Sequence, residues 1–201
     1  SYLCLSAWAS HSYAGAEKEL KKLQKFPATS VRFRVYRAFH NLLYWGRASN
    51  LKFTRLQRQE ACEEGLKLFE LLLPLDSLAE KACTLLEYLP LQEEGLLRAA
   101  EIALVNRSFP LARKTLARLS GHNRAQTLLQ ACLSAGLRDW PQAWVDFQAA
   151  SELEPKDPGP RLGMLYSLSG AAESLARRAK PPGTALAALE DLLELGENLF
   201  F

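Results

Sequence analysis

The scarcity of β-branched apolar residues limits what this chain can fold into. Isoleucine occurs once, at Ile102, and valine four times, whereas leucine occurs 40 times and alanine 28 times in 201 residues. Strands draw on β-branched and aromatic residues, while helices draw on leucine and alanine. The sequence therefore predicts an all-α protein. With 23% charged residues, wholesale disorder is not expected, and no apolar run reaches the roughly 18 residues of a membrane span.

Glycine and proline divide the chain into segments in which apolar residues recur every three or four positions. Short connections between such segments make successive helices antiparallel neighbours. Pro181, Pro182 and Gly183 separate the last segment from the others. The expected helices span residues 2–10, 13–26, 29–46, 54–73, 77–89, 93–106, 109–120, 124–137, 140–153, 158–178 and 184–199.

One stretch carries a recognisable helix-pair pattern. Its second helix has a small residue at Ala143, a large one at Phe147, a small one at Ala150 and a proline at Pro155, and Trp140 stands just before it. This stretch resembles a tetratricopeptide repeat, in which small residues let two helices cross closely. Weaker copies of the pattern start at Ala16, Cys62 and Ala112.

The resemblance implies a right-handed α-solenoid of about 11 antiparallel helices, with an irregular middle because the copies are unevenly spaced. The array is expected to cover residues 1–180, followed by a Pro/Gly linker at 181–183 and a capping or docking helix at 184–199. Each repeat of such an array buries its apolar face against its neighbours. An inner groove lined by the first helix of each pair then binds a peptide or helix of a partner.

The resemblance therefore predicts a non-catalytic protein-interaction scaffold. The family's clamp for a C-terminal carboxylate needs Lys, Asn and Arg at set places, and Gln126 and Gln130 stand there instead, so no such clamp is expected. The partner-binding residues expected in the groove are Arg32, Tyr36, Phe39, His40, Leu97, Glu101, Gln126, Gln130 and Tyr166.

Charge is unevenly distributed along the chain. Residues 1–60 carry a net charge of +8, and residues 61–201 carry −5. Such an asymmetry can steer an acidic partner, or a second copy of the chain. Arg55 and Arg58 are expected on the exposed side of the helix over 54–73, because Leu56, Cys62, Leu66 and Phe69 are predicted to form its buried stripe. A homo-oligomer could form through this asymmetry or through the C-terminal helix.

Two other functions stay open. The chain begins with Ser1, which favours a fragment, such as a helical-repeat regulatory or dimerisation domain of a larger transcription regulator. Nucleic-acid binding is the second alternative, because basic and aromatic side chains interleave in the N-terminal half. The residues that suggest it are Arg32, Arg34, Arg37, Arg47, Lys52, Arg55 and Arg58, with Phe33, Tyr36, Tyr44 and Trp45 between and beside them.

Residues that would carry chemistry are scattered. No phosphate loop, dinucleotide-binding glycine pattern or nucleophile elbow occurs, and the three histidines have no ligand-spaced partners. His11 and His122 are expected in turns, and the carboxylate pairs at 63–64 and 93–94 on solvated helix faces. We expect no enzyme activity, cofactor or metal. The four cysteines, widely spaced, are expected to be reduced core residues of a cytoplasmic protein, with a nuclear location not excluded.

Overall fold

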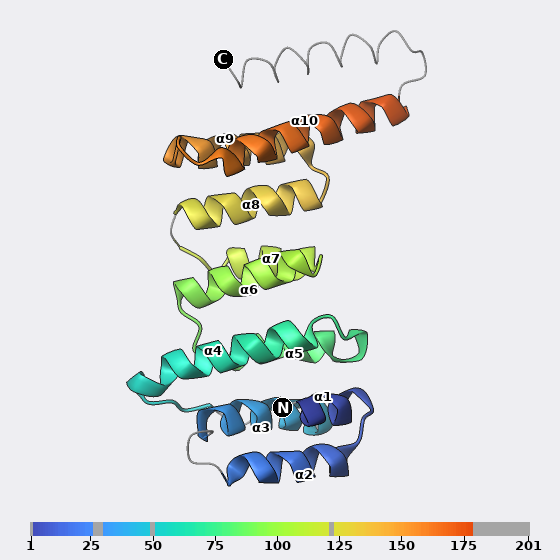
Figure 1. Ribbon diagram of the computed structural model, residues 1–201, viewed down its shortest axis with the longest axis vertical. Helices are drawn as coiled ribbons and strands as arrows, with labels where there is room; N and C mark the ends of the chain where they lie inside the picture. The colour runs from blue at the N-terminus through green and yellow to red at the C-terminus, as the bar shows by residue number, and fades with distance from the viewer. Residues whose placement is uncertain (1, 26–29, 49–50, 121–122, 179–201) are drawn as a thin grey trace. The chain divides into compact units, whose positions relative to one another are not determined.

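The computed structural model describes residues 2–25, 30–48, 51–120 and 123–178, and all regular structure in these ranges is helical (Figure 1). The all-α class is therefore confirmed. The expected linker over 181–183 and helix over 184–199 lie outside the described residues, as does His122. The helices are α1 (Tyr2–Ala9), α2 (Tyr13–Gln24), α3 (Ser30–Trp45), α4 (Arg55–Leu72), α5 (Asp76–Tyr88), α6 (Glu93–Val105), α7 (Phe109–Leu116), α8 (Arg124–Gly136), α9 (Trp140–Leu153) and α10 (Pro158–Arg178).

These bounds lie within two residues of the expected ones, except at the end of α7. That helix stops at Leu116 instead of residue 120. Arg118 N–H donates to the Thr115 carbonyl and Leu119 N–H to the Leu116 carbonyl, at 3.1 and 3.0 Å. Both bonds reach back three residues instead of four, so the chain tightens into a turn where a longer helix was predicted.

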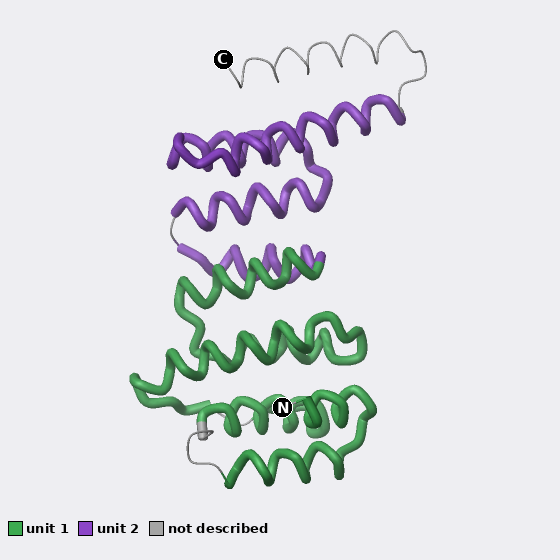
Figure 2. Tube along the Cα trace, viewed as in Figure 1, with its two compact units in different colours: residues 1–106 green, residues 107–201 purple. Residues whose placement is uncertain are grey.

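The chain divides into two compact units, residues 1–106 and residues 107–201 (Figure 2). In the first unit, each helix from α1 to α4 packs on the next one, and α3 also contacts α5 while α4 contacts α6. In the second unit, α7 packs on α8, α8 on α9 and α9 on α10, and α8 also contacts α10. Contacts between a helix and the second helix after it thus occur for α3, α4 and α8, and α1 also contacts α5.

Three connections between helices share one backbone conformation. The residue before the N-cap has a positive φ in each: 51° at His11, 56° at Arg107 and 60° at Arg138. This left-handed residue ends one helix and lets the chain turn into the next. His11 is thus a turn residue, as expected. The N-cap and the aromatic residue that opens the following helix are Ser12 and Tyr13, Ser108 and Phe109, and Asp139 and Trp140.

Small residues bring the helices of the second unit close together. Ala143 and Ala150 are fully buried, and Phe147 is buried between them. A Cβ atom added to Gly163 of α10 would overlap the Phe147 ring, and one added to Gly170 would overlap the Trp140 ring. The large side chains that were expected to fill the gap to the next helix therefore lie directly on glycines.

The register expected for α4 is wrong in part. Leu66 and Phe69 are buried as expected, but Cys62 is only half-buried and Leu56 is 92% exposed. The buried stripe starts at Ala61 instead, because the first turns of α4 lie beyond the stretch that packs on its neighbours. Cys62 still lies against α6, because a Cβ atom added to Gly95 would overlap its Sγ atom.

Candidate binding surfaces

One face of α3 is core, although the sequence assigned it to a binding groove. Trp8 of α1 packs on this face, with ring centroids 4.9 Å from Phe39 and 5.7 Å from Tyr36. The Trp8 indole Nε1–H donates to His40 Nδ1 at 3.3 Å. Tyr36, Phe39 and His40 are all buried. The prediction that these three residues contact a partner is wrong, because α1 covers them.

An ionic network lies beside His40. Arg37 of α3 donates two hydrogen bonds to the Glu17 carboxylate of α2, at 2.6 and 3.0 Å. His40 Nε2 lies 3.4 Å from Glu17 Oε2. Burial lowers the pKa of His40, although Glu17 opposes this shift. The hydrogen bond from Arg37 is the main cause that lowers the pKa of Glu17. The network joins α2 to α3 and so stabilises the fold.

Arg32 is engaged within the chain in the same way. Its guanidinium nitrogens Nε and Nη2 donate hydrogen bonds to Oε2 and Oε1 of Glu64 in α4, at 2.5 and 2.8 Å. Glu64 is buried, and the hydrogen bond from Arg32 lowers its pKa. The expectation of a solvated Glu64 is wrong. The helical spacing of Glu64 with Ala61 and Leu68 indicates that it lies on the buried face of α4, where a carboxylate requires a partner.

Arg34 also has intrachain contacts. Its guanidinium lies 4.2 Å from the centroid of the Phe53 ring and donates to Gln57 at 3.4 Å. Three arginines that suggested nucleic-acid binding, at positions 32, 34 and 37, thus have partners within the first unit. Arg55 and Arg58 at the start of α4 are exposed, as expected.

The other groove residues are divided between the two units. In the first unit, Leu97 is half-buried and the exposed Glu101 accepts a hydrogen bond from Arg98 at 2.7 Å. In the second unit, Gln126 is half-buried, and Gln130 and Tyr166 are exposed. The structure brings the Tyr166 ring against Trp140, with centroids 5.7 Å apart.

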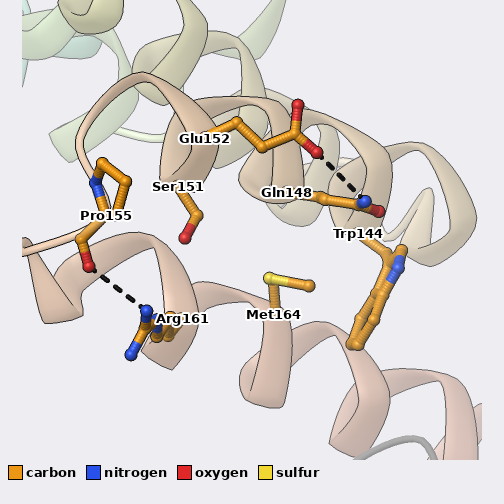
Figure 3. Close-up of a pocket in the computed structure, with 7 residues that line it drawn as sticks. All are labelled: Trp144, Gln148, Ser151, Glu152, Pro155, Arg161 and Met164. Carbon is orange, nitrogen blue, oxygen red and sulfur yellow. Dashed lines mark hydrogen bonds between the residues drawn. The ribbon is translucent and has the colours of Figure 1, made fainter. Parts of the chain in front are cut away.

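A groove of about 500 Å³ runs between α9 and α10 (Figure 3). Met164 of α10 lies in the middle of the lining residues, and Trp144 of α9 lies at the end away from Pro155 and Arg161. The Gln148 side-chain amide donates a hydrogen bond to the Glu152 carboxylate at 3.2 Å, and the Arg161 guanidinium donates one to the Pro155 carbonyl at 3.2 Å. The groove is not predicted from the sequence, because it is formed by residues of two helices. Its residues are Trp144, Gln148, Ser151, Glu152, Pro155, Arg161 and Met164.

A separate apolar face lies on α10. Leu162 and Tyr166 are each 61% exposed and stand four residues apart, so they share one side of the helix. Leu162 and Tyr166 lie roughly 150° around α10 from Arg161 and Met164, at about 100° per residue. The second unit therefore presents two distinct apolar surfaces, one open face and one groove.

No group of three or more His, Cys, Asp or Glu residues in the described ranges could hold a metal ion. None of the helices described is long and apolar enough to cross a membrane. The four cysteines are free, but Cys132 is exposed, which corrects the expectation that every cysteine is a core residue.

Comparisons with known proteins found no relative: no protein-family model matches the chain, and no curated protein or solved structure matches it significantly.

Proposed function

We propose that this chain is a tetratricopeptide-like α-solenoid that acts as a non-catalytic protein-interaction scaffold. The recurring turn supports the repeat architecture, because a left-handed residue, a polar N-cap and an aromatic residue occur in the same order three times. A fully buried alanine follows three residues after each aromatic residue: Ala16, Ala112 and Ala143. The contacts of α3 with α5, of α4 with α6 and of α8 with α10 fit the same repeat architecture.

The open face of α10 is the observation that carries the binding function. A partner that covers exposed leucine and tyrosine side chains on one side of a helix removes their apolar surface from water, which favours binding. Tyrosine in particular contributes strongly to protein interfaces, because it offers a large rigid apolar surface and a polar hydroxyl. We propose that Leu162 and Tyr166 contact a peptide or helix of the partner protein.

Affinity capture with the full chain tests this function. Leu162→Asp with Tyr166→Asp should abolish the recovery of proteins that the unchanged chain captures, because a carboxylate cannot be buried unpaired in an apolar contact. Leu153→Asp is the matched control, since Leu153 is also a half-exposed leucine, at the end of α9. Equal recovery with all three proteins would exclude this face as the binding surface.

A specific observation keeps nucleic-acid binding as a second candidate. Arg47, Lys52, Arg55 and Arg58 are exposed in the first unit, and single-stranded nucleic acid binds such cations through its phosphates. Binding by this route must weaken steeply as salt rises, because phosphate contacts release counterions. A salt titration with a single-stranded oligonucleotide decides the matter: flat or undetectable binding would remove this candidate.

A further inference from the structure

His40 of α3 is a fully buried histidine whose two ring nitrogens face different helices. The Trp8 indole of α1 donates a hydrogen bond to Nδ1 at 3.3 Å, and Glu17 Oε2 of α2 lies 3.4 Å from Nε2. We propose that the hydrogen bond from Trp8 to His40 is an acid-sensitive latch, and that protonation of His40 releases α1 from the aromatic face of α3. This latch lies in the first unit and is independent of the binding face on α10.

The hydrogen bond from Trp8 determines which nitrogen of His40 carries the ring proton. A neutral imidazole has one N–H group and one nitrogen with a free lone pair. Because the indole donates to Nδ1, that nitrogen keeps its lone pair and the proton is on Nε2, on the side of Glu17. An imidazolium has a proton on both nitrogens, so the proton on Nδ1 would point at the indole N–H. Protonated His40 and the hydrogen bond from Trp8 therefore exclude each other.

The surroundings of His40 favour its neutral form while α1 is in place. Burial is the largest cause that lowers the pKa of His40; Glu17 raises this pKa, and Arg37 of α3 lowers it. Both carboxylate oxygens of Glu17 already accept hydrogen bonds from Arg37, so the charge of Glu17 is partly neutralised. The rings of Tyr13 in α2 and Tyr44 in α3 pack on the imidazole, with centroids 5.1 and 4.8 Å away.

The other helices near α3 bring no charge that offsets this burial. None of the residues of α1 is charged. Helices α4 and α5 also pack on α3, but none of their described charged side chains shifts the pKa of His40. A proton on His40 is therefore opposed by burial and by the Trp8 donor, and release of α1 relieves both.

The direction of the pH dependence follows from these contacts. Once α1 is released, His40 can bind a proton near its ordinary pKa of 6.5, whereas its pKa is lower while α1 is in place. The released state thus binds more protons, so the docking of α1 is strongest above about pH 6.5 and weakens as the pH falls below this value.

The ion pairs that hold α3 to its other neighbours persist in this range. Hydrogen bonds from Arg37 and Arg32 lower the pKa values of Glu17 and Glu64 from 4.5, so both carboxylates remain charged at pH 5. Helices α2 and α4 therefore stay paired to α3 while Trp8 leaves. Because Trp8 packs on Tyr36 and Phe39, the latch determines whether the aromatic face of α3 is covered.

Cysteine reactivity in the full chain tests the latch. Cys4 lies on α1 and is buried, so its thiol reports the release of that helix. Cys62 is the control, because it belongs to the same unit but lies on α4 against Gly95 of α6. A pyridyl disulfide, which reacts with thiols in acid, labels the chain between pH 7.5 and pH 5. Peptide mass spectrometry measures each rate relative to the denatured chain at the same pH.

We expect the relative rate at Cys4 to rise at least about fivefold as the pH falls from 7.5 to 5, while the rate at Cys62 changes little. The rise should not exceed about tenfold per pH unit, which is the limit for the uptake of one proton. A constant rate at Cys4 in the unchanged chain would overturn the proposal. An equal rise at Cys4 and Cys62 would overturn it too, because the whole first unit would then open.

His40→Asn identifies the titrating group. The asparagine side-chain oxygen lies near the place of Nδ1, where it can accept the hydrogen bond from Trp8, and the amide does not titrate. The Cys4 rate of this variant should be the same at pH 7.5 and pH 5. His11→Asn is the matched control, since His11 is exposed and asparagine tolerates its positive φ, and it should keep the full rise. A rise that survives His40→Asn would assign the pH dependence to another group and overturn the latch.

Discussion

Ala143 is the residue on which the repeat register depends most directly. It is fully buried in the second unit, within a cluster formed with Ala131, Ala135, Phe147 and Met164. Ala143→Leu should destabilise the protein by about 1–3 kcal/mol, because extra methylene groups in a packed core force its neighbours to move. Chemical denaturation measures this change in the free energy of unfolding.

Ala125→Leu is the matched control for this prediction. Ala125 lies on α8 and is exposed, so the same enlargement should change stability by less than about 0.5 kcal/mol. If the two variants lose equal and small amounts of stability, position 143 is not a close helix crossing. The tetratricopeptide-like register of the proposal would then be wrong.

The buried carboxylate of Glu64 should make stability depend on pH. Arg32 lowers its pKa below the ordinary value of 4.5, so the folded state favours the charged carboxylate more than the unfolded state does. The stabilisation of the folded state by the charged Glu64 carboxylate is complete above about pH 4.5, and it is lost as the pH falls through the lower pKa of the folded state. On acidification, the free energy of unfolding of the Glu64→Gln protein should therefore fall less than that of the unchanged protein.

At neutral pH, Glu64→Gln should cost about 1–2 kcal/mol, because it weakens two charge-assisted hydrogen bonds from Arg32. The Arg32 side chain is 40% exposed, and solvent screening keeps the cost in this range. Glu101→Gln is the control, since the pair of Glu101 and Arg98 lies on the surface. Thermal melts between pH 3 and pH 7 would contradict the assignment if both variants behaved alike.

At the scale of the elements, the left-handed turn residues offer a direct test. Arg138 has a φ of 60° between α8 and α9, where a side chain is unfavourable by about 1–2 kcal/mol compared with glycine. Arg138→Gly should raise the free energy of unfolding by about 0.5–1 kcal/mol, after the greater freedom of glycine in the unfolded chain is subtracted.

Arg138→Ala separates the backbone effect from the loss of the arginine side chain. Alanine keeps its Cβ atom and cannot relieve the positive φ, so this variant should be less stable than Arg138→Gly. Urea denaturation of both proteins measures the difference. An alanine variant as stable as the glycine variant would show that this turn is not held in the left-handed conformation.

The helices could be predicted from the sequence more completely than the surfaces. Leucine and alanine at helical spacing, with glycine and proline between segments, determine where each helix starts and ends, because these are local effects. Which helix covers which face is a non-local property. Periodicity placed Tyr36 and His40 on one face of α3, but this face is buried because Trp8 of α1 and Tyr13 of α2 pack on it.

For the candidate site, too, features of a single helix could be predicted, whereas contacts between different helices could not. Exposure of Tyr166 and of Arg55 was predicted correctly, because each lies off the apolar stripe of its helix. The pair of Arg32 and Glu64 was missed, since its members are 32 residues apart and belong to different helices. The groove of Trp144 and Met164 was missed for the same reason, because it exists only where α9 and α10 meet.

At the scale of the whole molecule, charge is the property that sequence alone establishes. The first 60 residues carry +8 and the remainder −5. The contacts of Arg32 with Glu64 and of Arg37 with Glu17 use part of the positive charge inside the first unit. The exposed cations of this part include two groups: Lys18, Lys21, Lys22 and Lys25 in and just after α2, and Lys52, Arg55 and Arg58 near the start of α4. The second group tests the predicted steering role of the asymmetry.

Reversal of Arg55 and Arg58 to glutamate should therefore weaken binding to an acidic partner, or to a second copy, without unfolding the protein. The first turn of α4 contains no acidic residue, so the new carboxylates would interact favourably with the positive end of the helix dipole. This effect is worth about 0.3–1 kcal/mol per charge. The doubly substituted protein should thus melt at or slightly above the temperature of the unchanged one.

Binding and stability should consequently move in opposite directions, which a melt run beside each binding measurement would show. The loss of binding should also shrink as salt rises, because exposed charges interact only weakly beyond a Debye length of about 8 Å at physiological ionic strength. Affinity capture and analytical ultracentrifugation at low salt measure the partner contact and self-association. If neither changes in the Arg55→Glu, Arg58→Glu protein, the basic start of α4 is a solvated surface that plays no part in association.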